Sequence, residues 1–329
     1  MIRVKVPGRV NLIGDHTDYT GGLVFPMTID RYTTITGERI EDEVVLESDA
    51  GVGEVRFRLG TAHDPNFEPE WGRYVTAVAS LLERPLGIRG LISTTIPVGA
   101  GLSSSAALEI ASALALGARM DSKSLALLTQ KAERLATGVS TGIMDQLCIS
   151  SGRSGHGTLI DCHSLEVTHV PIPDDLQFVV LFIAHRTLVG SEYSRRVSEC
   201  AEAELIIGPL RLATEEDVLS IQDPIIRRRA RHVVTENQRV RRFADALRQR
   251  DYHEAGLVMI ESHESLSRDY EVSTALMDQA VNDAMMTPGV YGARMTGGGF
   301  GGSVVALCSK STHLDGWRVS ASSGPIVSD

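Results

Sequence analysis

The sequence predicts an α+β protein built from two domains. Its 329 residues are more than one ordinary hydrophobic core organises, and stretches with strand-like and helix-like hydrophobic patterns are interleaved along the chain. The segment LEVTHVPIPDDLQ (165–177) is polar and rich in proline, which is typical of a link between domains. We therefore expect an amino-terminal domain over 1–175 and a carboxy-terminal domain over 176–329.

Strands open the amino-terminal half. Ile2, Val4 and Val6 alternate with charged residues, which predicts a strand, and residues 1–60 as a whole are expected to be rich in strands. Hydrophobic residues recur on one side of 71–87, which indicates a helix. The other elements expected in this half are a strand at 91–99 that enters a loop at Pro97, a helix that begins at Ser103 or Ser104, and a helix over 121–137.

The carboxy-terminal half begins with FVVLFIAH (178–185), whose continuous apolar run predicts a buried strand. Helical patterns follow, and strand character returns on both sides of a glycine cluster. We expect helices at 191–205, 229–249 and 252–268, and strands at 293–296 (ARMT) and 303–308 (SVVALC).

Composition narrows the class of protein. The net charge of −10 argues against nucleic-acid binding, because phosphate backbones need a basic face. No apolar run approaches the ~18 residues of a membrane helix, so no membrane partner is expected, and MIRVKVPGRV lacks the apolar region of a secretory signal. The four cysteines are far apart, which favours reduced thiols and a cytoplasmic location.

Residues 225–250 test the charge argument, because they carry nine arginines. One interpretation is an anion-binding helix. The favoured interpretation is a solvated helix face, since apolar residues form a stripe along the same segment.

The segment PVGAGLSSSAA (97–107) is the first chemical signal. Gly99 and Gly101 permit positive φ and close backbone approach, and the serines lie where a helix begins. The free N–H groups of a helix start attract anions, and serine hydroxyls can bind phosphate or magnesium. A serine-capped helix that binds nothing is an equal alternative. The chain has no Gly-Lys pair and no HRD triplet, which excludes an ordinary P-loop and a protein-kinase catalytic loop.

The second glycine cluster formally matches GxGxxG at Gly297, Gly299 and Gly302. A dinucleotide-binding fold needs that motif between a strand and a helix, whereas SVVALC predicts a strand here. We therefore expect a glycine turn between two strands, approached closely by another segment or by a ligand.

Polar residues crowd into PGRVNLIGDHTDYTGG (7–22), which is expected to form a loop after the first strand. This loop could be a solvated turn that caps itself. It could also be a sugar site, because carboxylates and imidazole bind several hydroxyl groups and an arginine neutralises a phosphoryl group. The residues concerned are Arg9, Asn11, Asp15, His16, Asp18 and Tyr19.

Taken together, three segments resemble one family. PGRVNLIGDHTDYTGG resembles the galactokinase signature, PVGAGLSSSAA the phosphate loop of the GHMP kinase superfamily, and RMTGGGFGGSVVAL that superfamily's third motif. Shorter matches lie between them in family order: GIMDQ (142–146), LIDCHSLE (159–166), SEYSRRVSEC (191–200), HVVTENQRV (232–240) and SHESLSRDYEVS (262–273). The chain is identified as a member of the GHMP kinases, similar to galactokinase-like sugar 1-kinases over nearly its whole length.

The resemblance implies a fold and an activity. GHMP kinases pair a ribosomal S5-like amino-terminal domain with a ferredoxin-like carboxy-terminal domain, and their active site lies in the cleft between them. The implied reaction is ATP- and Mg²⁺-dependent phosphorylation of the C1 hydroxyl of galactose or a galactose-like sugar. The implied partners are the sugar and ATP, in a monomer or weak homodimer.

The resemblance also implies residue roles. Asp145 matches the catalytic aspartate that orients the anomeric hydroxyl and accepts its proton, and Arg9 matches its arginine partner. Ser104, Ser105 and Glu133 match the magnesium positions. The implied substrate-binding residues are Arg9, Asp15, His16, Asp18, Gly142, Asp145 and Tyr193; the implied ATP-binding residues are Pro97, Gly99, Ala100, Gly101, Leu102, Ser103, Ser104, Ser105 and Ala106; the turn expected to close over the site contains Gly297, Gly298, Gly299 and Gly301.

Some features depart from the family pattern and bear on the sugar. Asp15 stands where galactokinases usually have a glutamate near the C6 hydroxyl, so that end of the pocket could be deeper. Ser194 replaces the usual asparagine, His185 replaces a small polar residue, and the chain is shorter than most. A heptose or octose in a specialised pathway is therefore the alternative substrate.

Two further hypotheses concern the class of protein. A mevalonate- or homoserine-kinase branch is disfavoured by the sugar signature at 8–22. A non-catalytic regulator that binds sugar and ATP is disfavoured because Arg9, Asp145 and the complete serine loop are present.

Overall fold

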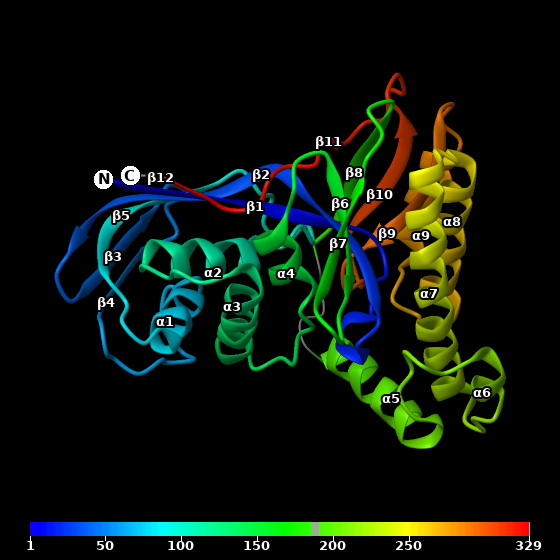
Figure 1. Ribbon diagram of the computed structural model, residues 1–329, viewed down its shortest axis with the longest axis horizontal. Helices are drawn as coiled ribbons and strands as arrows, with labels where there is room; N and C mark the ends of the chain where they lie inside the picture. The colour runs from blue at the N-terminus through cyan, green and yellow to red at the C-terminus, as the bar shows by residue number, and fades with distance from the viewer. Residues whose placement is uncertain (186–190, 329) are drawn as a thin grey trace.

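Two β-sheets, each covered by helices, make up the protein (Figure 1). The computed structural model describes residues 1–185 and 191–328. The first sheet is formed by β1 (Ile2–Ile13), β2 (Leu23–Ile40), β3 (Glu43–Ser48), β4 (Glu54–Arg58), β5 (Gly87–Thr94), β6 (His156–Asp161), β7 (Glu166–Pro171) and β12 (Ile326–Ser328). Its main path runs β12-β1-β2-β5-β3-β4, and β6 and β7 extend it from β2. The β3–β5 pair is parallel, and the other pairs are antiparallel.

Helices cover one side of the first sheet (Figure 1). They are α1 (Gly72–Leu81), α2 (Ser104–Ala115), α3 (Ser122–Thr137) and α4 (Met144–Ser151), and the short 3-10 helix η1 (Asp18–Thr20) follows β1. Helix α3 shows how local signals set the ends of a helix. Asp121 accepts hydrogen bonds from the backbone N–H groups of Lys123 and Ser124, and Gly138 ends the helix at φ 70°.

The second sheet has the order β11-β8-β10-β9 and is antiparallel throughout. Its strands are β8 (Leu176–Ala184), β9 (Val290–Thr296), β10 (Gly302–Ser309) and β11 (Trp317–Val319); the helices of this half are α5 (Ser191–Ile207), α6 (Glu215–Leu219), α7 (Pro224–Gln249), α8 (Tyr252–Arg268) and α9 (Ala275–Met285). Helix α8 lies very close to β9, since a Cβ added at Gly292 would be 2.3 Å from the carbonyl oxygen of Gly256.

The two halves are in direct contact. Phe25 of β2 packs edge-to-face against Phe243 of α7, with ring centroids 5.4 Å apart. The chain also returns to its starting point, because β12 pairs with β1 and the termini lie together (Figure 1). The domain boundary expected at 175 falls between β7 and β8 and stays a prediction.

Most predicted elements are present. Helices occupy 122–137, 191–207 and 252–268 as expected, and the glycine cluster connects antiparallel β9 and β10 rather than a strand and a helix. The helix expected over 71–87 is shorter, the strand expected over 91–99 ends at Thr94, and α4 and α9 were not expected.

One expectation was wrong, and another holds only in part. The polar loop begins at Gly14 rather than Pro7, because β1 continues to Ile13 and carries Arg9 and Asn11. The second half of β1 is buried on both faces, so the strand has no alternation of polar and apolar residues there. The arginine-rich helix has the expected solvated face, since five of the nine arginines in 225–250 are exposed, but Arg229 and Arg239 are buried in ion pairs with glutamates.

No helix in the described residues is both long and apolar enough to cross a membrane.

Candidate active site

A cavity of about 320 Å³ lies where β1, the loop before α2, the start of α4 and the β9–β10 turn converge. Most of the predicted site residues line it: Arg9, Asp15, His16, Asp18, Gly99, Gly101, Leu102, Ser103, Ser104, Ser105, Glu133, Gly142, Asp145, Tyr193, Gly297, Gly298 and Gly299. Pro97, Ala100, Ala106 and Gly301 are not part of its lining. Ala100, within the loop, and Ala106, in the first turn of α2, are fully buried, so they pack against the interior instead.

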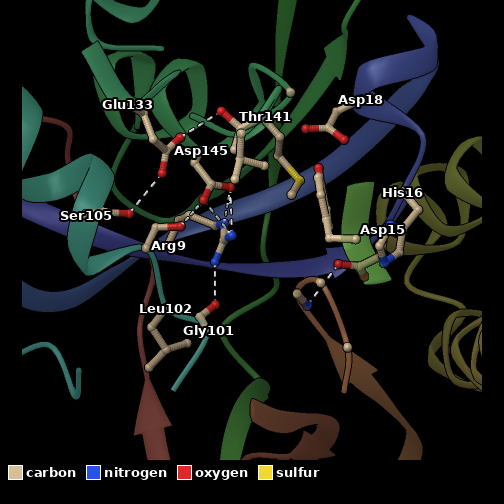
Figure 2. Close-up of a pocket in the computed structure, with 18 of the residues that line it drawn as sticks. Arg9, Asp15, His16, Asp18, Gly101, Leu102, Ser105, Glu133, Thr141 and Asp145 are labelled. Carbon is tan, nitrogen blue, oxygen red and sulfur yellow. Dashed lines mark hydrogen bonds and ion pairs between the residues drawn. The ribbon is translucent and has the colours of Figure 1, made fainter. Parts of the chain in front are cut away.

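Arg9 and Asp145 form a two-pronged ion pair on the cavity wall (Figure 2). Nε and Nη2 of Arg9 each donate to one oxygen of Asp145 over 2.8 Å, and Nη1 donates to the carbonyl of Gly101 over 2.6 Å. The hydroxyl of Ser103 also donates to Asp145. Burial alone would lower the pKa of Arg9, but the facing carboxylate of Asp145 raises it. The guanidinium of Arg9 therefore stays charged, and its two hydrogen bonds hold the carboxylate of Asp145 in one orientation.

Local structure brings this pair together. The register of β1 against β2 shifts between Pro7 and Arg9, and the backbone N–H of Arg9 donates to the carbonyl of Leu102 over 3.2 Å. The strand is thereby tied to the glycine loop. Asp145 lies in the first turn of α4, where the helix dipole favours a carboxylate.

The glycine loop presents an open helix end to the cavity. Gly99 and Gly101 have φ of 78° and 76°, and Ser103 also adopts a left-handed conformation. Ser103 makes no side-chain cap at the start of α2, so the first N–H groups of the helix face the cavity without a capping side chain. Such an end binds phosphate through its N–H groups and dipole.

Glu133 lies beside this helix end (Figure 2). Its carboxylate accepts hydrogen bonds from Ser105 Oγ at 3.1 Å, Thr141 Oγ1 at 3.0 Å and Gln146 Nε2 at 2.9 Å. Burial, and next the nearby charge of Asp145, raise the pKa of Glu133. A bound cation would offset both effects, and the carboxylate and hydroxyl oxygens at this end suit a hard cation such as Mg²⁺. No cluster of three or more acidic, histidine or cysteine ligands exists among the described residues.

Asp18 and Gly142 face one another at the other end of the cavity. A Cβ at Gly142 would lie 1.7 Å from Oδ2 of Asp18, so only glycine fits there. Burial, and next the charge of Asp145, raise the pKa of Asp18 to about 7. Asp18 can therefore donate or accept hydrogen bonds near neutral pH.

Aromatic groups border the same end. His16 has φ of 65°, and its Nδ1 lies 3.0 Å from the hydroxyl of Tyr19. The rings of His16 and Tyr193 are tilted, with centroids 5.6 Å apart. Tyr19 hydrogen-bonds in turn to Tyr270 over 2.5 Å. Flat rings beside hydroxyl-binding groups suit a polyhydroxylated ring.

Several residues that shape the site were missed by the sequence analysis. Gln146 follows Asp145 in GIMDQ and donates to Glu133, and Phe300 lines the cavity within the glycine turn. Arg294, in the ARMT segment, pairs with Asp15. A charged residue inside an otherwise apolar strand was the available signal for Arg294.

Comparison with known families identifies three matched regions. The galactokinase galactose-binding signature matches residues 2–39, the GHMP kinase N-terminal domain matches 73–153, and the GHMP kinase C-terminal domain matches 243–315.

Relatives with similar sequences carry the name galactokinase. The galactokinase of Chloroflexus aggregans is 43% identical over 299 residues, which cover 83% of this chain and 75% of the relative. The galactokinase of Homo sapiens is 41% identical over 299 residues, covering 84% and 76%.

Solved structures of GHMP kinases also superpose on this chain. Lactococcus lactis galactokinase in complex with galactose superposes with a TM-score of 0.92 at 31% identity, covering 99% of this chain and 95% of that one. The mevalonate kinase of Methanococcus jannaschii shares the fold at 20% identity, with a TM-score of 0.71 and 98% coverage of both chains. The expected two-part GHMP kinase fold is thus confirmed.

Proposed function

The chain belongs to the galactokinase family of the GHMP kinases, and we propose that it transfers the γ-phosphoryl group of ATP to the C1 hydroxyl of galactose. The observation that carries this proposal is the Arg9–Asp145 pair, which lies between the open end of α2 and the pocket around Asp18. An oriented carboxylate between a phosphate site and a hydroxyl-binding pocket is the arrangement that phosphoryl transfer to an alcohol needs.

In the proposed reaction, Asp145 orients the C1 hydroxyl and receives its proton. The C1 oxygen forms a bond to the γ-phosphorus while the bond to the bridging oxygen of ADP breaks. Arg9 stabilises the charge on the sugar oxygen and on the transferring group. Because Arg9 already fixes Asp145, little reorganisation is required when the substrates bind.

The glycine loop and α2 are proposed to hold the phosphates of ATP. Backbone N–H groups at 99–105 would bind the β- and γ-phosphates, and the turn at 297–302 would close over them. Glu133, Ser104 and Ser105 are proposed to hold Mg²⁺, with phosphate oxygens completing its shell. When bound, the cation supplies neutralisation of the β- and γ-phosphate charge.

The sugar is proposed to lie against His16, Asp18, Gly142 and Tyr193, with Asp15 at the edge of the pocket. We further propose that the enzyme acts in the cytoplasm, where ATP is made available, as a monomer or weak homodimer.

One observation favours a second candidate, a 1-kinase for a longer sugar. Both oxygens of Asp15 accept hydrogen bonds from the carboxy-terminal half, from Arg294 and from the backbone of Gly297. With both oxygens bonded in this way, the short carboxylate would make less contact with a sugar, and a longer chain is proposed to fit at that end.

A substrate panel tests both candidates. ADP release is measured with ATP and Mg²⁺ against galactose, other hexoses, and seven- and eight-carbon sugars, with Asp145→Asn as the control. Turnover that is strongest on galactose supports the first candidate, and strong turnover on a longer sugar with weak turnover on galactose supports the second. Asp145-independent ADP release on every sugar would reject both.

A further inference from the structure

Asp15 and Arg294 form a buried ion pair between segments 279 residues apart. Nη2 of Arg294 lies 2.5 Å from Oδ2 of Asp15, and the side chains of Arg294 and Asp15 are 0% and 2% exposed. The other oxygen, Oδ1, accepts the backbone N–H of Gly297 at 2.9 Å. One carboxylate thus connects the loop after β1 with both the end of β9 and the first residue of the glycine turn.

Glu236 of α7 extends the pair into a network. Its Oε1 lies 3.8 Å from Nη2 of Arg294 and accepts the N–H of Gly14 at 3.0 Å, and its Oε2 accepts Arg239 Nε at 2.7 Å. Burial raises the pKa of Glu236, but nearby positive charges outweigh this effect. The charge of Arg239, followed by those of His232 and Arg294, lowers the pKa of Glu236 to about 2. Two carboxylates and two guanidinium groups therefore balance one another in the interior.

Side chains of helix α7 also form hydrogen bonds with the backbone in and next to the loop after β1. His232 Nε2 lies 3.1 Å from the carbonyl oxygen of Asp15, and Asn237 Oδ1 accepts the N–H of Leu23 at 2.7 Å. His232 and Glu236 are four residues apart on the helix, so both side chains point from one face toward the loop. The segment HVVTENQRV, for which the sequence predicted no function, thereby contacts the loop that carries the proposed sugar ligands.

We propose that Arg294 is a positioning residue for the phosphoryl transfer, which acts by pairing with Asp15. The pair holds the loop at 14–22, which carries the proposed sugar ligands, in register with the glycine turn at 297–302 over the proposed phosphate site. Holding this register is the main contribution of Asp15, ahead of any contact with a sugar hydroxyl. The inference rests on the proposed sugar-kinase function.

The energetics of the Asp15–Arg294 pair indicate that it positions the two segments rather than stabilises the fold. Nε and Nη1 of Arg294 have no hydrogen-bond partner among the described residues, so its buried charge depends on Asp15 and Glu236. Buried ion pairs seldom add net stability compared with apolar packing, but they are directional. Misplacing reacting groups by about 1 Å costs on the order of 10²-fold in rate, so a directional contact at this junction has a large kinetic effect.

The test compares Asp15→Asn, Arg294→Met and the double variant, with Arg242→Met as the matched control. Arg242 also pairs with glutamates, but on the exposed face of α7. We measure kcat and KM for galactose and for each monodeoxygalactose. Each single variant is expected to lose about 10²-fold in kcat/KM. The double variant is expected to lose no more than either single variant, because both remove the same contact.

The pattern across sugars separates positioning from sugar binding. If the pair positions the loop, all deoxygalactoses lose activity in parallel, and the preference for galactose over each is unchanged. If Asp15→Asn instead abolishes discrimination at one hydroxyl while Arg294→Met preserves it, Asp15 is mainly a sugar ligand and the proposal is wrong. Additive losses in the double variant would also overturn it.

Hydrogen exchange gives a readout that needs no activity. In unliganded Arg294→Lys, which keeps the charge but loses the planar fork, amides in 14–22 and 296–302 are expected to exchange faster together. Unchanged exchange in both segments would contradict the proposal, even if Arg294→Met fails to fold. Absence of turnover by the native protein on every sugar of the panel would reject the proposed function, and the hydrogen-exchange result would then test only whether the pair holds the two segments together.

Discussion

Gly142→Ala is the most direct test of the proposed sugar-binding end of the site, because the added methyl group would clash with the carboxylate of Asp18. The added Cβ would lie 1.7 Å from Oδ2 of Asp18, and Cβ atoms are essentially never found within 3.0 Å of another heavy atom. One of the two groups must therefore move by about 1.3 Å, the difference between these distances. The backbone at 142 is not in the left-handed region, so alanine adds no conformational strain.

A displacement of this size should reduce kcat/KM for galactose by about 10²-fold, or about 2.7 kcal/mol of transition-state stabilisation. The KM for ATP should stay unchanged, because the glycine loop is not touched. A coupled ADP-release assay measures both constants. In an Asp18→Ala background, Gly142→Ala should have little further effect, since the obstructed carboxylate is absent. An equally large effect in that background would refute the steric argument.

Other groups of the site and of the fold can be tested in the same way. Asp145→Asn should lower kcat by about 10²–10⁴-fold in the ADP-release assay while thermal unfolding shows that the protein is folded, because the amide cannot receive the proton. The KM for galactose should fall as pH rises through about 7, because the raised pKa of Asp18 leaves it protonated and a poorer acceptor below that pH; a titration of Asp18→Asn should lack this inflection. Glu133→Gln should raise the Mg²⁺ concentration needed for half-maximal activity by at least about 10-fold, with little change in the KM for galactose. Arg229→Met should lower the free energy of unfolding in urea by about 1.5–3 kcal/mol, because Glu199 and Glu271 each lose a charged hydrogen-bond donor but keep Arg196 and Arg228 as ion-pair partners.

The regular elements could be predicted where one face of an element is buried and the other is solvated. Helix α3 shows a clear period and has Asp121 and Gly138 at its ends, so its limits were predicted within a residue. The second half of β1 is buried on both faces, which removes the alternating pattern and led to its polar residues being assigned to a loop. Helix α4 is only eight residues long and nearly all buried, so it shows no amphipathic period.

The residues of the site could be predicted where they lie within a recognised sequence motif. Arg9, Asp145 and Glu133 were expected from the resemblance, and the structure brings them to one cavity. The partner of Asp15 could not be predicted, because Arg294 stands out only as a charge within an apolar strand and nothing in the sequence connects it with Asp15. Pairing between segments so far apart depends on how β9 crosses the end of β1, which is a property of the tertiary fold.

The contrast between apolar and charged contacts explains why the charges are buried at this junction. Phe25 and Phe243 hold the halves together by non-directional packing, which tolerates small sliding movements. The bonds of Asp15 to Arg294 and Gly297 do not tolerate sliding, because they depend on distance and angle. Phosphoryl transfer requires reacting atoms within about 3–3.5 Å of one another. Directional contacts are therefore needed where the loop at 14–22 meets the glycine turn at 297–302. A variant that replaced the ion pair by well-packed apolar side chains should therefore be as stable as the native protein and still be a slow enzyme.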